Sequence, residues 1–395
     1  MFLLQWRSVP LLQSLLHNLK KFRNGWKTPG IQDCIWVHTR WNLWLELHIG
    51  QFLNVPLTVA MIQCQTLVIK KTISNKAINP FRDPYMTSII VAPKEDIHAF
   101  AVSRECEKLG REVVILDPSG YGSEFNLTTV LSESSNEFAI DWIDGKTLKR
   151  ENISGIWWRR PFEKTSDQDP HPSVNKIILR ERHQALFGSL ISGVRNQFNS
   201  LEASKTASLK VLQLTVAQQL GLKIPNTLIS TDITEVEQWF STFEGNAVFK
   251  MFHGVDFAVL ETRKLLREHL VEAWRVTKCP VIFQQYIPGY FDVRATVVGN
   301  EVFFARLNYQ EHDGIIDSRL TQQEALHAEA PVELQAKLIE LVRRLGLRYG
   351  AIDLRRSITD EWIFFEINPE GQYLWTEIEA GLQISASIAK QLYAD

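Results

Sequence analysis

The stretch FFEINPEGQYLW, residues 364–375, places two oxygen-bearing side chains inside an otherwise apolar segment. Glu366 and Asn368 are two positions apart, and side chains two apart on a β-strand point to the same face. Strict alternation predicts that Phe364 shares that face, whereas Phe365 and Ile367 point to the other. Burying an unpaired carboxylate is costly, so such a pair lies on a solvated face, in an ion pair or on a metal ion.

A third oxygen ligand is predicted on the preceding strand, YGAIDL, where Asp353 lies between Ile352 and Leu354. The short loop RRSITDE then leads directly into the strand of Glu366. A hairpin of these two strands brings Asp353 beside Glu366 and Asn368. Three hard oxygen ligands on adjacent strands suit Mg²⁺, which usually completes its shell with water and substrate phosphates. The pattern therefore indicates a bound polyphosphate.

Basic residues at predicted helix and strand positions supply positive charge that could balance a polyphosphate. Lys210 lies at a predicted helix start, Lys250 in the strand AVFKMF and Arg294 in the strand FDVRATVV. Together they could line a polyphosphate. Taken singly, a lysine on a strand is more often a surface residue, and Asp292 with Arg294 is more often a local ion pair. Neither GxxxxGK[ST] nor GxGxxG occurs, so a nucleotide would be held by another kind of site.

Strands and helices alternate from residue 86 onward, which predicts an α/β (α+β) fold with a parallel or mixed sheet. The first block, 86–200, has strands at 86–92 and 112–116, helices at 96–109 and 174–196, and a β-rich middle that contains GIWWRRP. The second, 201–287, has the helix SLKVLQLTVAQQLGL, a helix after Asp232, the strand NAVFKMF, a helix at 262–276 and the strand PVIFQQYIP. The third, 288–395, has a hairpin around Gly299-Asn300, a helix at 331–345, the strands YGAIDLRR and EWIFFEINP, and a helix from about 384.

Composition narrows the class of protein. The formal net charge of -2, with no long basic run, argues against a general nucleic-acid binder. The four cysteines show no ligand or disulfide spacing. No apolar run reaches the roughly 18 residues that a membrane span needs. We therefore expect a cytoplasmic protein with no nucleic-acid or membrane partner.

Residues 1–85 differ from the rest of the chain. They hold ten of the 43 lysines and arginines against three of the 45 acids, and five of the twelve tryptophans. No helical or strand periodicity runs through them. We expect the native protein to begin at Met86, with a start codon assigned too far upstream. The alternative is a basic, aromatic accessory region that docks a partner or a membrane surface.

Several motifs after residue 86 resemble those of ATP-grasp ligases, and most closely the graspetide maturases that cross-link microviridin-type ribosomal peptides. The resemblance implies an ATP-grasp fold with a pre-ATP-grasp α/β domain at 86–200, a central subdomain at 201–287 and a C-terminal subdomain at 288–395 that carries the Mg-ATP site. The motifs are WWRRP, KVLQLTVAQQLGLKIPNTL, VFK, FQQYIPGYFDVRATVVG, IDSR, YGAIDL and FFEINPEGQYLWTEIEAGLQIS.

The resemblance also implies roles for single residues, with ATP and Mg²⁺ as cofactors. The phosphate-facing arginine is Arg294, and Arg319 lies near the reacting carboxylate. Gln285 stands where this branch usually has an acidic residue, and Ser318 where it usually has an aromatic one. The implied nucleotide contacts are Lys210, Lys250, Gln284, Gln285, Tyr286, Ile287 and Asn368, and the implied Mg²⁺ ligands are Asp353, Glu366 and Asn368.

In the activity that this resemblance implies, Asp or Glu side chains of a ribosomal precursor peptide become acyl phosphates. Thr, Ser or Lys side chains of the same peptide then capture them as macrolactones or macrolactams. The leader of that peptide would dock on an exposed edge, and the enzyme would be a homodimer. Two alternatives remain open: a ligase that adds an amino acid to a protein or small-molecule carboxylate, and a non-catalytic nucleotide-binding module.

The motif WWRRP has a structural interpretation as well. Trp157 and Trp158 are expected in the core of the first domain. Arg159 and Arg160 are interpreted as a solvated or ion-paired strand end, slightly favoured over a role in substrate binding.

Overall fold

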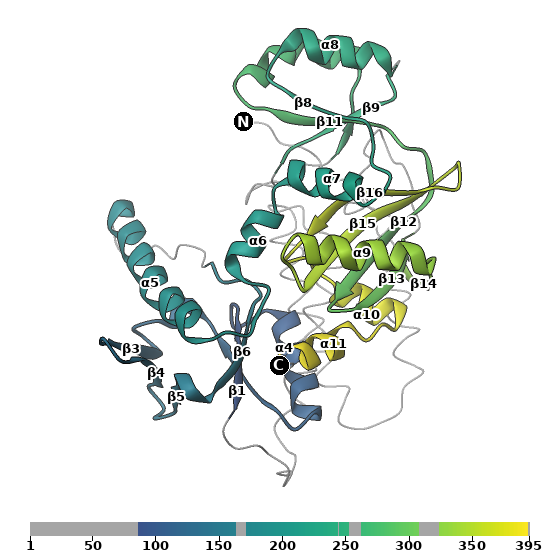
Figure 1. Cartoon of the computed structure of the whole chain (residues 1–395). Helices are drawn as coiled ribbons and strands as arrows, with labels where there is room; N and C mark the ends of the chain where they lie inside the picture. Colours follow the sequence, from purple (N-terminus) through teal and green to yellow (C-terminus); the bar gives the residue numbers. More distant parts are fainter. Residues whose placement is uncertain (1–85, 163–170, 244, 253–261, 308–323, 394–395) are drawn as a thin grey trace, which may run out of the picture. The chain divides into compact units, whose positions relative to one another are not determined.

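The structure is a computed structural model that describes residues 86–162, 171–243, 245–252, 262–307 and 324–393 (Figure 1). All of them belong to one unit of the chain, Asn75–Asp395. The expected start at Met86 and the role of Arg319 concern residues 1–85 and 319, which lie outside the described residues.

The first sheet is parallel, as the alternation of strands and helices predicts. Its strand order is β2-β1-β6-β7, and α4 connects β1 to β2. Asp96 caps α4, because its carboxylate accepts hydrogen bonds from the amides of His98 and Ala99. A three-stranded antiparallel sheet, β3-β4-β5, accounts for most of the β-rich middle, whereas its GIWW segment forms β6 of the parallel sheet. The elements are β1 (Thr87–Val91), α4 (Ile97–Lys108), β2 (Glu112–Leu116), β3 (Phe125–Leu131), β4 (Asn136–Trp142), β5 (Thr147–Lys149), β6 (Ile153–Trp158), α5 (Pro172–Gly193) and β7 (Gln197–Phe198).

The WWRRP motif ends strand β6. Trp157 and Trp158 are buried, as expected for core aromatics. Arg159 is only 1% exposed and lies 3.6 Å from the carboxylate of Asp96, whereas the Arg160 side chain is half exposed and lies 3.8 Å from it. The strand end is therefore ion-paired, and at Arg159 it is not solvated.

The second sheet is antiparallel, in the order β10-β9-β11-β8. The expected helix at 262–276 is wrong in part, since Arg263–Lys264 forms β10 and a 3₁₀ helix follows at Arg267–Thr277. The β10 residues pair with Phe249 and Val248, which satisfies edge backbone groups that a helix would leave open. The other elements of this block are α6 (Leu201–Ala207), α7 (Lys210–Gln219), β8 (Thr227–Ser230), α8 (Ile233–Thr242), β9 (Ala247–Lys250) and β11 (Val281–Gln285).

The third sheet has five antiparallel strands in the order β14-β13-β12-β15-β16. The expected hairpin of β12 and β13 turns at Gly299, whose φ of 59° suits glycine. Strand β14 and helix α10 were not expected from the sequence. The elements are β12 (Gly289–Val298), β13 (Glu301–Leu307), β14 (Ala325–Ala328), α9 (Val332–Arg344), β15 (Tyr349–Ser357), β16 (Trp362–Asn368), α10 (Leu374–Ala380) and α11 (Ile384–Gln391).

A β-bulge in β16 overturns the simple alternation expected for FFEINP. Asp353 pairs with Glu366, but the next residue on β15, Leu354, pairs with Phe364. Phe365 is thus the extra residue of the bulge. As a result Phe364 and Ile367 are both fully buried in one core. Phe365 and Glu366 are only partly buried and line a cavity, which Ile367 also borders. The prediction that Phe364 shares the face of Glu366 is wrong for this reason.

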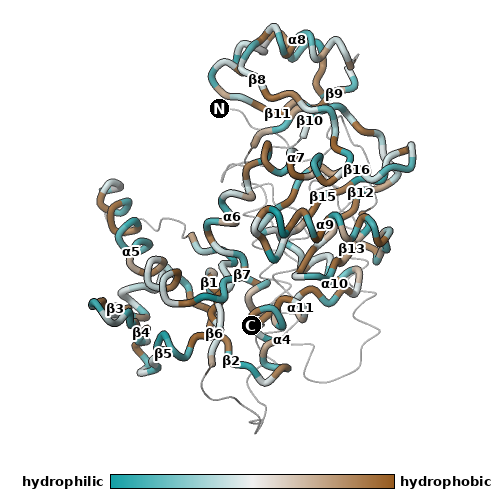
Figure 2. Tube along the Cα trace, viewed as in Figure 1, coloured by the Kyte–Doolittle hydropathy of each residue, from teal (hydrophilic) through white to brown (hydrophobic). Residues whose placement is uncertain are grey.

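The third sheet packs against α7 and α9 through a common apolar core. Helix α9 turns Leu334, Leu338, Leu341 and Val342 inward, and hydrophilic residues alternate with them along the helix in Figure 2. This core fixes α7 and the sheet relative to each other. Within the described part of the chain, no helix combines the length and apolar character that crossing a membrane requires.

Candidate active site

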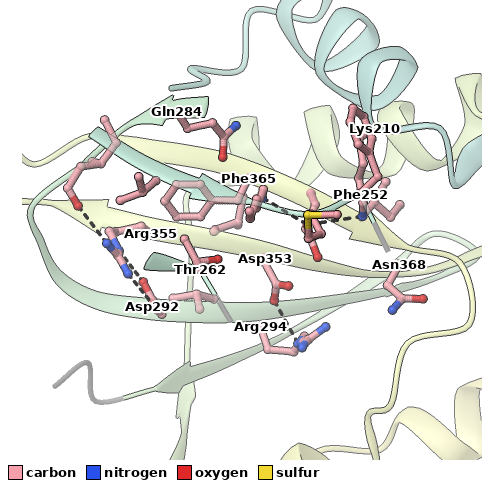
Figure 3. Close-up of a pocket in the computed structure, with 18 of the residues that line it drawn as sticks. Lys210, Phe252, Thr262, Gln284, Asp292, Arg294, Asp353, Arg355, Phe365 and Asn368 are labelled. Carbon is pink, nitrogen blue, oxygen red and sulfur yellow. Dashed lines mark hydrogen bonds and ion pairs between the residues drawn. The ribbon is translucent and has the colours of Figure 1, made fainter. Parts of the chain in front are cut away.

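A cavity of about 360 Å³ lies between the second and third sheets (Figure 3). Most of its lining comes from β9, β11, β12, β15, β16 and the start of α7. Every predicted site residue that the structure describes lines this one cavity: Lys210, Lys250, Gln284, Gln285, Tyr286, Ile287, Arg294, Asp353, Glu366 and Asn368. Residues nearly 160 positions apart in the chain therefore meet at one place.

Two lysines converge on Glu366. The Nζ atoms of Lys210 and Lys250 each lie 3.3 Å from the same carboxylate oxygen, Oε2 of Glu366. Lys210 is the first residue of α7 and Lys250 the last residue of β9. Two ammonium groups that share one carboxylate leave a net positive charge, which suits an anionic ligand such as a polyphosphate.

Asp353 lies on β15, an inner strand of the third sheet, opposite Arg294 on β12 and opposite Glu366 on β16. Its Oδ1 is 3.1 Å from Arg294 Nε. Burial raises the pKa of Asp353, the positive charge of Arg294 lowers it, and the nearby carboxylate of Glu366 raises it further. Two neighbouring carboxylates that repel each other in this way favour a cation between them.

The oxygen donors at this point fit Mg²⁺. Asp353 and Glu366 supply carboxylates, and Asn368 supplies an amide oxygen that accepts a hydrogen bond from the Glu370 amide, 3.0 Å away. Among the described residues, no three His, Cys, Asp or Glu side chains gather into a closed metal cage. An open set of few carboxylates beside basic residues is the arrangement that Mg²⁺ uses when phosphates complete its shell.

Arg355 is a cavity residue that sequence reasoning missed. Its guanidinium forms two hydrogen bonds with Asp292, at 2.6 and 3.0 Å, and a third to the carbonyl oxygen of Ile287, at 2.9 Å. The expected local pair of Asp292 with Arg294 is wrong, because each residue pairs across the sheet instead.

The signal for this cross-strand pairing is present in the sequence. Strand β12 reads Asp292-Val-Arg294 and strand β15 reads Asp353-Leu-Arg355. Antiparallel pairing places Asp292 opposite Arg355 and Arg294 opposite Asp353. Two copies of the pattern Asp-x-Arg on neighbouring antiparallel strands complement each other, since opposite charges face each other at both positions.

The end of β11 forms the far wall of the cavity. Gln284 is buried and donates to Thr227 Oγ1, and Gln285 accepts from the side chain of Asn226. The backbone amide of Tyr286 donates to the carbonyl oxygen of Asn246. These contacts hold the segment in place. Apolar residues of the lining, among them Val248, Ile287, Leu354 and Phe365, give walls that suit a planar ring.

Comparison with solved structures decides the class of protein. The macrocyclase MdnC from Microcystis aeruginosa MRC, bound with precursor peptide MdnA, has a TM-score of 0.70 and 29% identity, over 78% of this chain and 100% of MdnC. A RiPP-associated ATP-grasp ligase from Chryseobacterium gregarium, in complex with ADP and a leader and core peptide, has a TM-score of 0.72 and 25% identity, over 78% of this chain and 96% of that one. The chain is an ATP-grasp ligase.

A further macrocyclase from the same Microcystis strain, MdnB, has a TM-score of 0.66 and 26% identity, over 79% of this chain and 100% of its own. The matched share is close to the part of the chain that follows residue 85. The expected ATP-grasp fold with a mixed α/β architecture is thus confirmed. No protein-family model matches the chain, and no curated protein matches it.

Proposed function

We propose that this ATP-grasp ligase cross-links a ribosomal precursor peptide, and that the cavity between the second and third sheets holds Mg-ATP. Side-chain carboxylates of the peptide core would be activated and joined to Thr or Ser hydroxyls or to Lys amines. The observation that carries the proposal is the convergence of Lys210 and Lys250 on Glu366, opposite Asp353. The similarity to a macrocyclase and to a RiPP-associated ATP-grasp ligase, both bound to peptides, supports the choice of substrate.

The residues that line the cavity have distinct tasks in this proposal. Lys210, Lys250 and Arg294 bind the phosphates and stabilise the charge that develops on the transferring phosphoryl group. Gln284, Gln285, Tyr286 and Ile287 form the wall against which the adenine lies. Asp353, Glu366 and Asn368 would hold Mg²⁺, which when bound neutralises phosphate charge and orients the γ-phosphoryl group. Arg319 is assigned to the reacting carboxylate on the family resemblance alone.

The reaction has two steps. An oxygen of the peptide carboxylate attacks the γ-phosphorus, the bond to ADP breaks, and an acyl phosphate forms. The hydroxyl or amine of a second side chain then attacks the acyl carbon, phosphate leaves, and the nucleophile loses its proton. Each bond therefore consumes one ATP and removes the mass of one water from the peptide. The enzyme contributes position and charge, and no covalent bond to the protein is required.

The proposed partners of the enzyme are the leader of the precursor and a second copy of the chain. The leader of the precursor would bind the enzyme separately from the core, so that the core reaches the cavity at a high effective concentration. The working enzyme is proposed to be a cytoplasmic homodimer. Light scattering of the purified chain at several concentrations tests the dimer directly.

Mass spectrometry of a candidate precursor tests the function. The full chain is incubated with Mg-ATP and a small acidic peptide, rich in Thr and Lys, that is encoded beside its gene. We expect the peptide to lose one or more waters with the wild type and no water with Glu366→Gln. A matched control is Glu361→Gln, which makes the same change on the β15–β16 turn, where Glu361 pairs with Lys223 outside the cavity lining.

The other outcomes separate the alternatives. ATP turnover that raises the mass of an acceptor by an added amino acid, with no loss of water from the peptide, would replace the proposal with an amino-acid ligase. Absence of turnover in the wild type with every peptide, despite nucleotide binding, would favour a non-catalytic module.

A further inference from the structure

Gln213 is a buried polar residue on α7, one turn after Lys210. The residue is 1% exposed, and its side chain makes three hydrogen bonds. Nε2 donates to the carbonyl oxygens of Ala207, at 2.6 Å, and of Ile367, at 2.8 Å, while Oε1 accepts from the amide of Ile367, at 3.1 Å. The amide group of one glutamine therefore connects α6, α7 and β16.

The contact with Ile367 takes the place of a strand-to-strand pairing. Among the strands that the structure describes, β16 is the last of its sheet, so one edge of its backbone pairs with none of them beyond a single bridge from Lys223 to Ile363. At Phe364 that edge is satisfied by the carbonyl oxygen of Lys223, and at Ile367 by the side chain of Gln213. A buried edge amide and carbonyl without partners would each cost free energy. Gln213 thus fixes the backbone at Ile367, between Glu366 and Asn368.

The same residue fixes the helix that carries Lys210. The residue before α7, Leu209, offers no side-chain cap, so the first turn of the helix lacks the usual anchor. The side chain of Gln213, which lies inside the helix sequence, supplies the anchor instead. It forms hydrogen bonds with Ala207, the last residue of α6, and with Ile367 at the edge of β16. Lys210 is three residues earlier, on the same side of the helix, and its Nζ reaches Glu366 at 3.3 Å.

We infer that Gln213 is a positioning residue of the active site. It holds the helix of the phosphate-binding lysine in register with the strand of two Mg²⁺ ligands, and through them it sets how tightly metal and nucleotide bind together. The inference rests on the proposed function, since it assigns phosphate and Mg²⁺ to these side chains. Residues that orient metal ligands without touching the metal typically contribute 10- to 100-fold to metal affinity or activity.

A residue that only stabilises the fold would behave differently. Its loss would lower the melting temperature and leave the effect of Mg²⁺ on nucleotide affinity unchanged. Gln213→Met keeps the length of the side chain and removes all three hydrogen bonds. Val216→Ala is the control, because Val216 is a buried core residue of the same helix and makes no side-chain hydrogen bond to β16.

Calorimetric titration of the full chain with ADP, with and without Mg²⁺, separates the two roles. In the wild type we expect Mg²⁺ to tighten ADP binding. In Gln213→Met we expect this gain to shrink by about 10-fold, whereas Val216→Ala retains it despite a lower melting temperature. Retention of the full gain by Gln213→Met would overturn the inference.

A second variant covers the case in which Gln213→Met does not fold. Gln213→Asn keeps the amide group but is one methylene shorter, so it cannot bridge α7 and β16 in the same way. It is expected to reduce the gain from Mg²⁺ in the same direction, and an unchanged gain would overturn the inference. Failure of the wild type to bind ADP at all would instead overturn the proposed function, and with it the inference.

Discussion

Asp292 and Arg355 form a two-hydrogen-bond ion pair across β12 and β15, and the same guanidinium binds the carbonyl oxygen of Ile287. The pair is largely buried, with side chains 13% and 5% exposed. It connects the sheet that carries the acidic residues to the segment that forms the opposite wall of the cavity. The pair therefore joins two walls of the proposed nucleotide site.

Removing Arg355 should leave a buried carboxylate without its partner. We expect Arg355→Met to lower the free energy of unfolding by about 3–5 kcal/mol, the usual result of breaking a buried pair. Arg356→Met is the matched control, because Arg356 pairs with the exposed Asp360, and its loss should cost about 1 kcal/mol. Urea denaturation measures both. Equal losses in the two variants would contradict the proposed importance of the buried pair.

The bulge at Phe365 predicts opposite behaviour for two adjacent phenylalanines. Phe364 is fully buried in the core, so Phe364→Ala should cost about 3–5 kcal/mol of stability. Phe365 lines the cavity, so Phe365→Ala should cost far less stability and should weaken ADP binding. Thermal unfolding and nucleotide titration of both variants provide the check. Strict alternation would require Phe364, and not Phe365, to affect binding.

Lys250 offers a direct test of phosphate binding. Lys250→Met removes one of the two ammonium groups at Glu366, and we expect ATP turnover to fall by about 100-fold, as when one charge-stabilising donor is lost. Lys223→Met is the control, since Lys223 pairs with Glu361 outside the cavity lining. Steady-state release of ADP measures the effect. Similar turnover in the two variants would remove Lys250 from the proposed site.

His98 should make stability depend on pH. The imidazole is 4% exposed, packs edge-on against Tyr373 and lies near Arg159 and Arg160. Burial first, and then the two arginines, lower the pKa of His98 well below its usual range. As pH falls below about 6.5, the unfolded chain binds a proton that the folded chain does not. The contribution of neutral His98 to the free energy of unfolding is therefore fully present above that pH, and it is lost as the pH falls toward the folded pKa of His98.

The size of this effect follows from proton linkage. Between the unfolded and folded pKa values of His98, the wild type should lose about 1.4 kcal/mol of unfolding free energy per pH unit. His98→Phe keeps an aromatic ring and removes the titrating group, so its stability should decline less steeply between pH 6.5 and 5. Denaturation curves of both proteins at several pH values test this prediction. Parallel pH profiles would show that His98 does not carry the effect.

The hairpin of Asp353 and Glu366 was predictable, because a short loop joins the two strands and leaves their register little freedom. The bulge was not, since the letters FFEINP are compatible with strict alternation and only tertiary packing of Phe364 and Ile367 selects the bulge. The contacts of Gln213 were also hidden, because its partner Ile367 lies 154 residues away and a glutamine inside a helix carries no signal of its own.

The most direct test of the proposed chemistry follows the oxygen atoms of the precursor. Its side-chain carboxylates are labelled with a heavy oxygen isotope, and the phosphate released during cross-linking is analysed by mass spectrometry. Activation as an acyl phosphate predicts that one labelled oxygen passes to phosphate for each bond formed. Cross-linked peptide accompanied by unlabelled phosphate would contradict the account.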